Sequence, residues 1–477
     1  MTEYEVVIGL EVHVHLSTKS KAFCGCSTTF GQPPNSSTCP VCLGLPGALP
    51  VLNKEAFKSA IKVALALDCE IQEKVKFDRK NYYYPDLPKN YQISQYDMPL
   101  AFNGYLDISS GGKKRINITR VHLEEDAGKL IHDPNKNLSY VDFNRTGIPL
   151  LEIVSEPDIR NSDEACEYLK NLKAILLYLG VSNCNMEEGS LRCDANISVR
   201  RIGEKKLGAK VELKNMNSFK AVGVALMYEH ARQEGLLEKN LSITQETRLW
   251  DSDKLYTVTM RTKEETQDYR YFPEPDLVPF FIDTKEIEDI KNTLPELPKQ
   301  RRGRFVNQYK LTKFEADVII MDKGIADYFE ETVKLLNSPK TISNWLTGDI
   351  MSELNLKNIS IDKLGFTPKM LAELIGLINN ATISGKMAKG LLRECIEKRL
   401  PPEEIVKQKG LKQISGETEL DDIIRKVIEE NSKSVNDYKK GKTNAVMFLV
   451  GQVMRHTKGK ANPEVVNKLL KKKLNKE

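Results

Sequence analysis

Residues 6–16 read VVIGLEVHVHL, and apolar residues alternate there with Val7, Gly9, Glu11, His13 and His15. A period of two predicts a β-strand with one face on a core and with Glu11, His13 and His15 on the opposite face. Imidazole and carboxylate groups on one rigid strand provide half of a divalent-metal site. A solvated strand face would show the same alternation, so this segment leaves both interpretations open.

The composition is that of a globular protein with several domains. A length of 477 residues predicts about three domains. The net charge of +5 is compatible with a nucleic-acid partner but is too small to indicate one. No apolar run approaches the roughly 20 residues of a membrane span, and the N-terminal MTEYE lacks the basic and apolar segments of an export signal. We therefore expect a cytoplasmic protein without membrane contact.

Four of the nine cysteines form a cluster just after the first predicted strand. Cys24 and Cys26 stand in CGC, and Cys39 and Cys42 stand in CPVC. Four thiolates suit a tetrahedral zinc ion, and a site closed by four protein ligands is structural. The remaining interpretations are reduced thiols without a ligand and redox chemistry. An odd cysteine count without an export signal argues against a disulfide framework.

Further polar side chains lie on predicted strands in the first 290 or so residues. Three acids end the strand predicted over 115–126, and one acid interrupts the apolar run LLEIV. A buried acid needs a metal ion or a basic partner. Together these strands predict a concave surface lined by Glu11, His13, Glu125, Glu152, Arg192 and Asp194. Carboxylates with one imidazole favour magnesium or manganese, which suits phosphoryl-transfer or nuclease chemistry.

Residues 77–96, FDRKNYYYPDLPKNYQISQY, combine basic and aromatic side chains, and the prolines exclude a regular helix. Such a mixture can stack nucleobases and contact phosphates. A loop anchored on its own domain by half-buried tyrosines is the alternative interpretation.

The chain changes character near LPELPKQ, residues 294–300, and is helical in its pattern from there on. Pro401 and Pro402 mark a second break, and the end of the chain is rich in lysine. We predict an α+β protein with a sheet-built domain over 1–294, a helical domain over 295–403 and a helical tail over 404–477. The basic tail residues are either a solvated face or an RNA contact; they are Lys439, Lys440, Lys442, Arg455, Lys458, Lys460 and Lys471 to Lys473.

Seven sequence blocks, spread from about residue 4 to 470, resemble the GatB-type subunit of the aspartyl/glutamyl-tRNA amidotransferases. These blocks are VIGLEVHVHL, FDRKNYYYPDLPKNYQISQYD, RVHLEEDAGK, PLLEIVSEPDIR, EEGSLRCDANISVR, QDYRYFPEPDLVP and FLVGQVMRHTKGKANPEVVNKLL. The resemblance implies a cradle domain, a helical domain and a helical tail that meets tRNA. It also implies an ATP-dependent ligase of translation that amidates misacylated Glu-tRNA(Gln), Asp-tRNA(Asn) or both.

The same resemblance implies partners and cofactors. A separate glutaminase subunit would supply ammonia, and a third, small subunit would complete a heterotrimer. ATP and Mg²⁺ would serve the reaction, and Zn²⁺ would be structural, held by Cys24, Cys26, Cys39 and Cys42 as in the family members that keep a zinc site.

Transferred to this chain, the family's Mg²⁺ and phosphoryl site involves Glu11, His13, Glu125 and Glu152, with Asp194 close by. Glu124 is the alternative to Glu125, because strand alternation does not decide which acid points inward. Arg192 is expected to stabilise phosphate charge, and Lys80 or Lys214 could do so from loops. Two rival functions use the same residues: a metal-dependent RNA nuclease or phosphohydrolase, and an RNA-binding scaffold without catalysis.

Overall fold

The computed structural model describes residues 4–110, 112–133, 135–262, 269–410, 417–439, 442–457, 461 and 463–475. The chain forms two compact units, Met1–Pro298 and Lys299–Glu477. The predicted boundary at residue 294 lies close to this division. Lys440, Lys458 and Lys460, three of the predicted RNA-contacting residues, lie outside the described residues.

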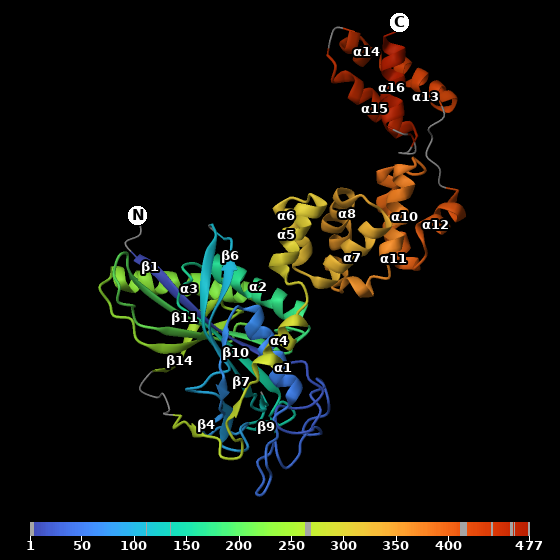
Figure 1. The fold of residues 1–477 in the computed structure, drawn as a ribbon. Helices are drawn as coiled ribbons and strands as arrows, with labels where there is room; N and C mark the ends of the chain where they lie inside the picture. The colour runs from blue at the N-terminus through green and yellow to red at the C-terminus, as the bar shows by residue number, and fades with distance from the viewer. Residues whose placement is uncertain are drawn as a thin grey trace. The chain divides into compact units, whose positions relative to one another are not determined.

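Unit 1 is built on a nine-stranded sheet in which the predicted first strand is central (Figure 1). Strand β1 pairs antiparallel with β11 on one side and with β10 on the other. In spatial order the strands are β14 (Tyr256–Thr262), β13 (Glu246–Asp251), β12 (Val211–Lys214), β11 (Leu191–Arg201), β1 (Tyr4–His15), β10 (Pro149–Ser155), β7 (Lys114–Glu125), β6 (Ala101–Ile108) and β2 (Glu70–Ile71).

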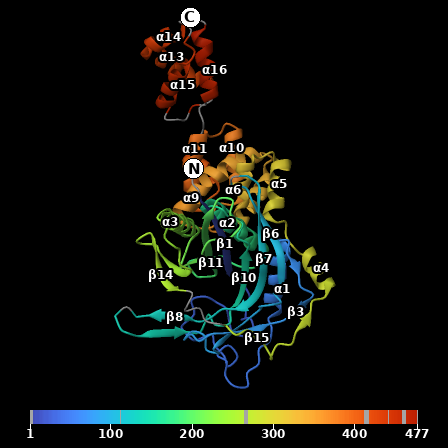
Figure 2. The same cartoon turned by 90° about the vertical axis from the view of Figure 1, so that its left-hand side faces the viewer.

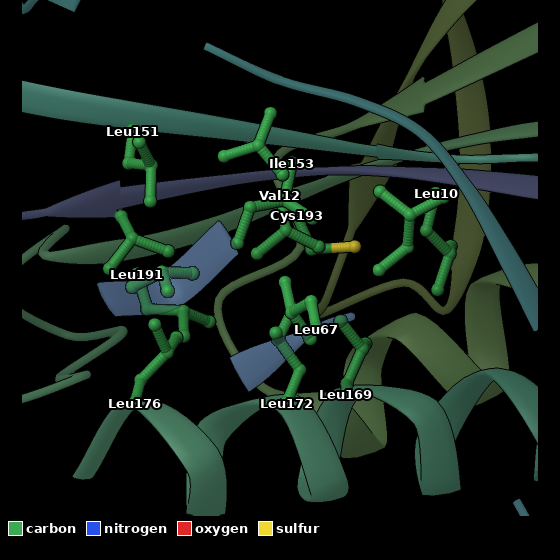
Figure 3. Packing of buried hydrophobic residues seen from close by; sticks show 14 of the residues in the cluster. Leu10, Val12, Leu67, Leu151, Ile153, Leu169, Leu172, Leu176, Leu191 and Cys193 are labelled. Atoms are coloured by element: carbon green, nitrogen blue, oxygen red, sulfur yellow. The ribbon is translucent and has the colours of Figure 1, made fainter. Parts of the chain in front are cut away.

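Three helices, α1 (Lys54–Ala66), α2 (Ser162–Leu179) and α3 (Phe219–Glu238), pack on one face of this sheet. Leu10 and Val12 of β1 point toward Leu169 and Leu172 of α2 (Figure 3), and all four side chains are buried. The apolar row of residues 6–16 therefore faces the helices, as its alternation predicts, and leaves Glu11, His13 and His15 on the other face. Helix α4 (Thr284–Asn292) packs against α1.

Short strands form three small sheets beside the main one. The first consists of β15 (Phe272–Pro273), β4 (Asp78–Asn81) and β5 (Tyr91–Ser94), so the proline-containing segment 77–96 contributes two strands. The second pairs β16 (Phe280–Phe281) with β3 (Lys74–Val75). The third, β8 (Lys129–His132) with β9 (Ser139–Asp142), is a ribbon that extends away from the nine-stranded sheet (Figure 2).

Unit 2 is built from helices and contains two separate apolar clusters. The first cluster runs from Phe305 to Val406 and includes Ile405 of α12, and the second runs from Leu420 to Leu474. The helices are α5 (Pro298–Tyr309), α6 (Lys313–Ile320), α7 (Lys323–Leu335), α8 (Pro339–Trp345), η2 (Leu346–Ile350), α9 (Met351–Lys357), η3 (Ile361–Lys363), α10 (Pro368–Asn379), α11 (Gly385–Lys398), α12 (Pro402–Lys409), α13 (Glu417–Glu430), α14 (Ser432–Lys439), α15 (Ala445–His456) and α16 (Pro463–Leu474). The α+β fold class is confirmed. The predicted boundary at residue 403 stays a prediction.

Among the helices of the described residues, none combines the length and the apolar composition needed to cross a membrane.

Candidate functional site

Strand register brings three titratable side chains into one row across the main sheet. His13 of β1 lies opposite Glu152 of β10, and Glu152 lies opposite His122 of β7. Side chains at opposite positions of antiparallel strands have Cβ atoms about 4.5–5.5 Å apart. Glu152 is therefore held between two imidazoles by backbone pairing alone.

The carboxylate oxygens of this cluster converge on the imidazole nitrogens. Glu152 Oε2 lies 3.3 Å from His13 Nε2 and 3.4 Å from His122 Nε2. Glu124 reaches both rings, with Oε1 3.9 Å from His13 Nε2 and Oε2 3.4 Å from His122 Nε2. Glu11 Oε1 lies 3.6 Å from His13 Nε2. Three carboxylates and two imidazoles thus share one small volume, which we call the Glu152 cluster (Glu11, His13, His122, Glu124 and Glu152).

The cluster is too buried to be a solvated strand face. The exposed fraction of the side chain is 6% for Glu152, 3% for Glu124 and 5% for His122. Burial would raise the pKa of Glu152, but His122 and His13 hold it well below its usual range. Burial would lower the pKa of His122, but Glu152 and Glu124 raise it to about 9. The carboxylates therefore demand positive charge at this point of the sheet.

A divalent cation fits this donor set. The ligand atoms of Glu11, His13 and Glu152 lie within 4.8 Å of one another, and so do those of His122, Glu124 and Glu152. Burial, together with the neighbouring Glu152, raises the pKa of Glu11, as expected where carboxylates crowd without enough positive charge. Oxygen-rich sets with imidazole suit magnesium or manganese.

The structure corrects one residue of the predicted ligand set. Glu125 does not join the Glu152 cluster, because its carboxylate accepts hydrogen bonds from Lys89 Nζ and from the backbone N–H of Ile93, the latter at 2.9 Å. Glu124 points to the cluster instead, and Ser94 Oγ donates to its Oε2 at 2.8 Å. Successive residues of a strand point to opposite sides, so only one of the two acids can face His13.

His122 is the member that the sequence analysis missed. It lies two residues before Glu124 on the same strand, so the same alternation that selects Glu124 selects His122 as well.

A second charged group, centred on Asp126, lies next to this cluster. Arg192 Nη2 lies 3.1 Å from Asp126 Oδ1, His15 Nε2 lies 2.5 Å from Oδ2, and Arg145 Nε lies 3.4 Å from Oδ2. Burial would raise the pKa of Asp126, but Arg192, Arg145 and His15 hold it well below its usual value. Arg192 is thus oriented by a buried carboxylate, which is also the partner of His15.

The two remaining predicted lysines occupy different surroundings. Lys214 pairs with Asp194 and with Glu212, its Nζ lying 3.0 Å from Glu212 Oε1. Asp194 lies opposite Glu11 in the β1–β11 register, so this pair borders the Glu152 cluster. Lys80 lies in β4, with its Nζ 4.9 Å from the ring centre of Tyr269, and Glu124 contributes to a raised pKa of its ammonium against the effect of burial.

A cavity of about 570 Å³ opens beside these groups. Its lining includes His15, Arg145, Arg192 and Asp194, together with Lys129 at the start of β8. Arginine and lysine side chains around a cavity favour an anionic ligand, and bidentate arginine suits phosphate.

The four predicted cysteine ligands come together in the segment between β1 and α1. The Sγ atoms of Cys24, Cys26, Cys39 and Cys42 lie within 4.8 Å of one another. A hydrogen bond with Cys24 and the nearby Lys21 ammonium lower the pKa of Cys42 to about 5. This four-cysteine cluster can hold a tetrahedral metal ion.

The fold and the site define an α+β protein with a candidate divalent-metal centre on its main sheet, attached to a helical unit. The chain matches the GatB/GatE catalytic domain over residues 6–288 and the GatB domain over residues 327–474. It belongs to the GatB family.

Curated relatives match over nearly the whole length of both chains. All are named as the subunit designated B of aspartyl/glutamyl-tRNA(Asn/Gln) amidotransferase. The relative in Carboxydothermus hydrogenoformans is 57% identical, covering 99% of each chain, and the one in Brevibacillus brevis is 54% identical, covering 100% of each. The relative in Caldanaerobacter subterraneus is 56% identical, covering 99% of this chain and 100% of the relative.

Proposed function

We propose that this chain is the subunit of a tRNA-dependent amidotransferase that activates and amidates the side-chain carboxylate of misacylated Glu-tRNA(Gln), Asp-tRNA(Asn) or both. The names of its full-length relatives support the reaction class. The observation that carries the mechanism is the Glu152 cluster, a buried set of carboxylates and imidazoles that suits Mg²⁺.

The reaction needs an activated carboxylate, because the oxygen of a free side-chain carboxylate is a poor leaving group. Transfer of the γ-phosphoryl group of ATP to that oxygen gives an acyl phosphate and ADP. Ammonia then attacks the carbonyl carbon, phosphate leaves, and the amide remains. When bound, Mg²⁺ offsets the negative charge that accumulates as two anions meet.

The residues of this chain would divide the work as follows. Glu11, His13, Glu124 and Glu152 hold the metal, and His122 completes the set. Arg192, fixed by Asp126, faces the cavity and binds phosphate oxygens. Lys214 and Lys80 add positive charge at the two sides of the cluster.

The ammonia would come from another chain. The sequence contains neither a G-x-S-x-G nucleophile segment nor a Gly- and Ser-rich amidase segment. We propose a glutaminase subunit and a small third subunit as partners in a heterotrimer, with a path for neutral NH₃ from the glutaminase to the Glu152 cluster. The assembly would work in the cytoplasm.

Two further roles belong to the proposal. The four-cysteine cluster holds structural Zn²⁺ and keeps the segment between β1 and α1 folded. The lysine-rich C-terminal helices contact the tRNA backbone.

Product analysis tests the proposal. The chain is purified with its partner subunits and supplied with ATP, Mg²⁺ and glutamine, and either Glu-tRNA(Gln) or Asp-tRNA(Asn). Amide formed on either aminoacyl-tRNA, together with ADP and phosphate, supports the proposal and identifies the substrate. Cleavage of the RNA instead, or binding without amide formation, contradicts it and favours the nuclease or the scaffold.

A further inference from the structure

Tyrosines from two distant parts of the chain meet beside the Glu152 cluster. Tyr82 and Tyr96 belong to the β4–β5 region, whereas Tyr269 and Tyr271 precede β15. Tyr96 and Tyr271 are stacked, with ring centres 4.2 Å apart and planes 11° from parallel. Tyr82 and Tyr269 meet edge to face at 5.9 Å. We call these four residues the tyrosine platform.

The platform is held rigidly by hydrogen bonds outside the rings. The backbone N–H of Asn81 donates to Tyr269 O at 2.9 Å, and the backbone N–H of Tyr96 donates to Asp78 Oδ2 at 3.0 Å. Arg79 binds Glu274 through two N–H groups, each 2.8 Å from its acceptor oxygen, which ties β4 to the segment after β15. A preorganised aromatic surface loses little conformational entropy when a ligand stacks on it.

Packing alone does not account for these rings. The exposed fraction of Tyr96 is 61%, although Tyr271 covers one of its faces. Its other face is therefore open to a planar ligand. Lys80, whose Nζ lies 4.9 Å from the centre of Tyr269 and 5.9 Å from that of Tyr82, adds positive charge beneath the rings.

The platform lies close to the proposed reaction centre. Ser94 Oγ contacts Glu124 directly, and Tyr96 is only two residues further along the chain, about 7 Å in an extended segment. An aromatic surface with a cation is the chemistry that proteins use to stack nucleobases.

We propose that the tyrosine platform binds an adenine base and thereby fixes one substrate of the reaction beside the Glu152 cluster. This inference rests on the proposed function, in which two substrates carry adenine. One is ATP, and the other is the aminoacylated 3′-terminal adenosine of the tRNA. Stacking on Tyr96 would set the distance from base to metal centre for whichever substrate it holds.

Two fluorescent probes distinguish these sources, because 2-aminopurine is quenched when it stacks. The first probe is tRNA(Gln) with 2-aminopurine at its 3′ end, and the second is 2-aminopurine riboside triphosphate. Each is titrated into the complex with the partner subunits, for the wild type and for Tyr96→Ala, Tyr96→Phe and the double variant Tyr96→Ala/Tyr271→Ala. Tyr140→Ala, at an exposed tyrosine on β9, is the matched control.

We expect the wild type to quench one probe, Tyr96→Phe and Tyr140→Ala to retain the quenching, and the double variant to lose it. Affinity for the triphosphate probe, if that is the one bound, should fall about 5- to 150-fold in the double variant, the effect of removing one base–aromatic stack. Loss with the RNA probe assigns the platform to the terminal adenosine, and loss with the triphosphate assigns it to ATP. The inference is overturned if the wild type quenches neither probe or the double variant changes neither signal.

A parallel amidation assay separates this inference from the function on which it rests. A wild-type complex that makes no amide contradicts the proposed function. A wild-type complex that makes amide, but whose probe signals do not depend on Tyr96 and Tyr271, contradicts only the platform.

Discussion

Glu152 shows how one buried carboxylate can determine the chemistry of a sheet. Burying an unpaired carboxylate costs several kcal/mol, and Glu152 is 4% exposed. His13 and His122 on the two neighbouring strands offset this cost through positive charge. A bound divalent ion would replace that charge and take Glu152 as the ligand shared by both halves of the cluster.

Glu152→Gln should abolish amide formation, because a neutral amide removes the shared anionic ligand while keeping the side-chain volume. We expect at least a hundredfold loss in the rate of amidation, about 3 kcal/mol in transition-state free energy, with tRNA binding preserved. Single-turnover amidation and a tRNA binding titration measure the two effects. Glu156→Gln, four residues along the chain, is the matched control, since Glu156 accepts a hydrogen bond from Thr119 outside the cluster. Normal amidation by Glu152→Gln would contradict the assignment.

Lys21 is a second buried charge, and it belongs to the four-cysteine cluster. Its side chain is fully buried, and Nζ donates to Ser37 O at 2.8 Å and to Phe143 O at 3.3 Å. Lys21→Met should leave both carbonyls without this donor, at about 1–3 kcal/mol each. Denaturant unfolding should show the loss, and Lys19→Met, at an exposed lysine nearby, should not. Equal unfolding midpoints for the two variants would rule out the role of Lys21.

The residues of the site differ in how far the sequence predicts them. Glu11 and His13 follow from alternation within one strand, and Glu152 follows from an acid inside an apolar run. Choosing Glu124 over Glu125 requires the pairing register of β7 with β10, which no local pattern contains. Lys21 carries no local signal at all, because its partners Ser37 and Phe143 come from loops that meet only in the fold.

At the scale of elements, long strands and helices are predictable and short strands are not. The alternation of residues 6–16 is long enough to identify β1, which becomes the central strand. Strands β4 and β15 are 4 and 2 residues long and pair across almost 200 positions of the chain. Because such short strands form through non-local contacts, local sequence predicted a loop at 77–96 and could not predict the tyrosine platform.

The segment between β1 and α1 depends on its four cysteines for order. In this segment the structure shows only one isolated bridge, between Ser20 and Ser27. Removing zinc with a chelator, or the substitution Cys39→Ser, should therefore expose residues 24–42 to proteolysis and lower the melting temperature. Mass spectrometry of the cleavage sites and zinc analysis of the untreated protein measure this. Cys166→Ser, at a cysteine of α2, should retain zinc, and untreated protein without zinc would contradict the proposal.

The contact between α5 and α7 gives unit 2 a defined pH dependence. Burial would raise the pKa of Glu330, but Arg304, Tyr309 and Arg301 lower it to about 2. Arg301 Nη2 lies 2.6 Å and Tyr309 Oη 2.9 Å from its carboxylate. A lowered carboxylate pKa stabilises the fold above the unfolded-state value near 4.5, and this contribution is lost as the pH falls toward 2.

Glu330→Gln should therefore destabilise unit 2 at pH 7, by up to about 3 kcal/mol, and by progressively less below about pH 4.5. Urea unfolding of wild type and variant at a series of pH values gives the difference in free energy of unfolding. Glu331→Gln, at the exposed neighbouring residue, should show no such trend. A difference that stays constant with pH would contradict the charge-based explanation.

At the scale of the whole molecule, the proposed chemistry and the proposed tRNA grip belong to different units. The Glu152 cluster, the four-cysteine cluster and the tyrosine platform all lie in unit 1. The lysine-rich helices α14 to α16 lie in unit 2 and have an apolar cluster of their own, from Leu420 to Leu474. Because that cluster is separate from the one that ends at Val406, the tail can be removed without opening the rest of unit 2.

Truncation after Gly410 should weaken tRNA binding and reduce its salt dependence. This cut keeps α12, whose Ile405 and Val406 belong to the first apolar cluster of unit 2. Each phosphate contact contributes about 0.9 to the slope of log K against log salt on duplex RNA or DNA, so the loss of several lysine contacts should lower the slope by several units. Lys471→Gln/Lys472→Gln, at two exposed lysines of α16, should lower it by up to about 2. Lys357→Gln, at an exposed lysine of α9, is the control. Because the Glu152 cluster remains, the truncated complex should still amidate at saturating Glu-tRNA, with a raised KM and an unchanged kcat. An unchanged salt slope would show that the basic tail is a solvated face.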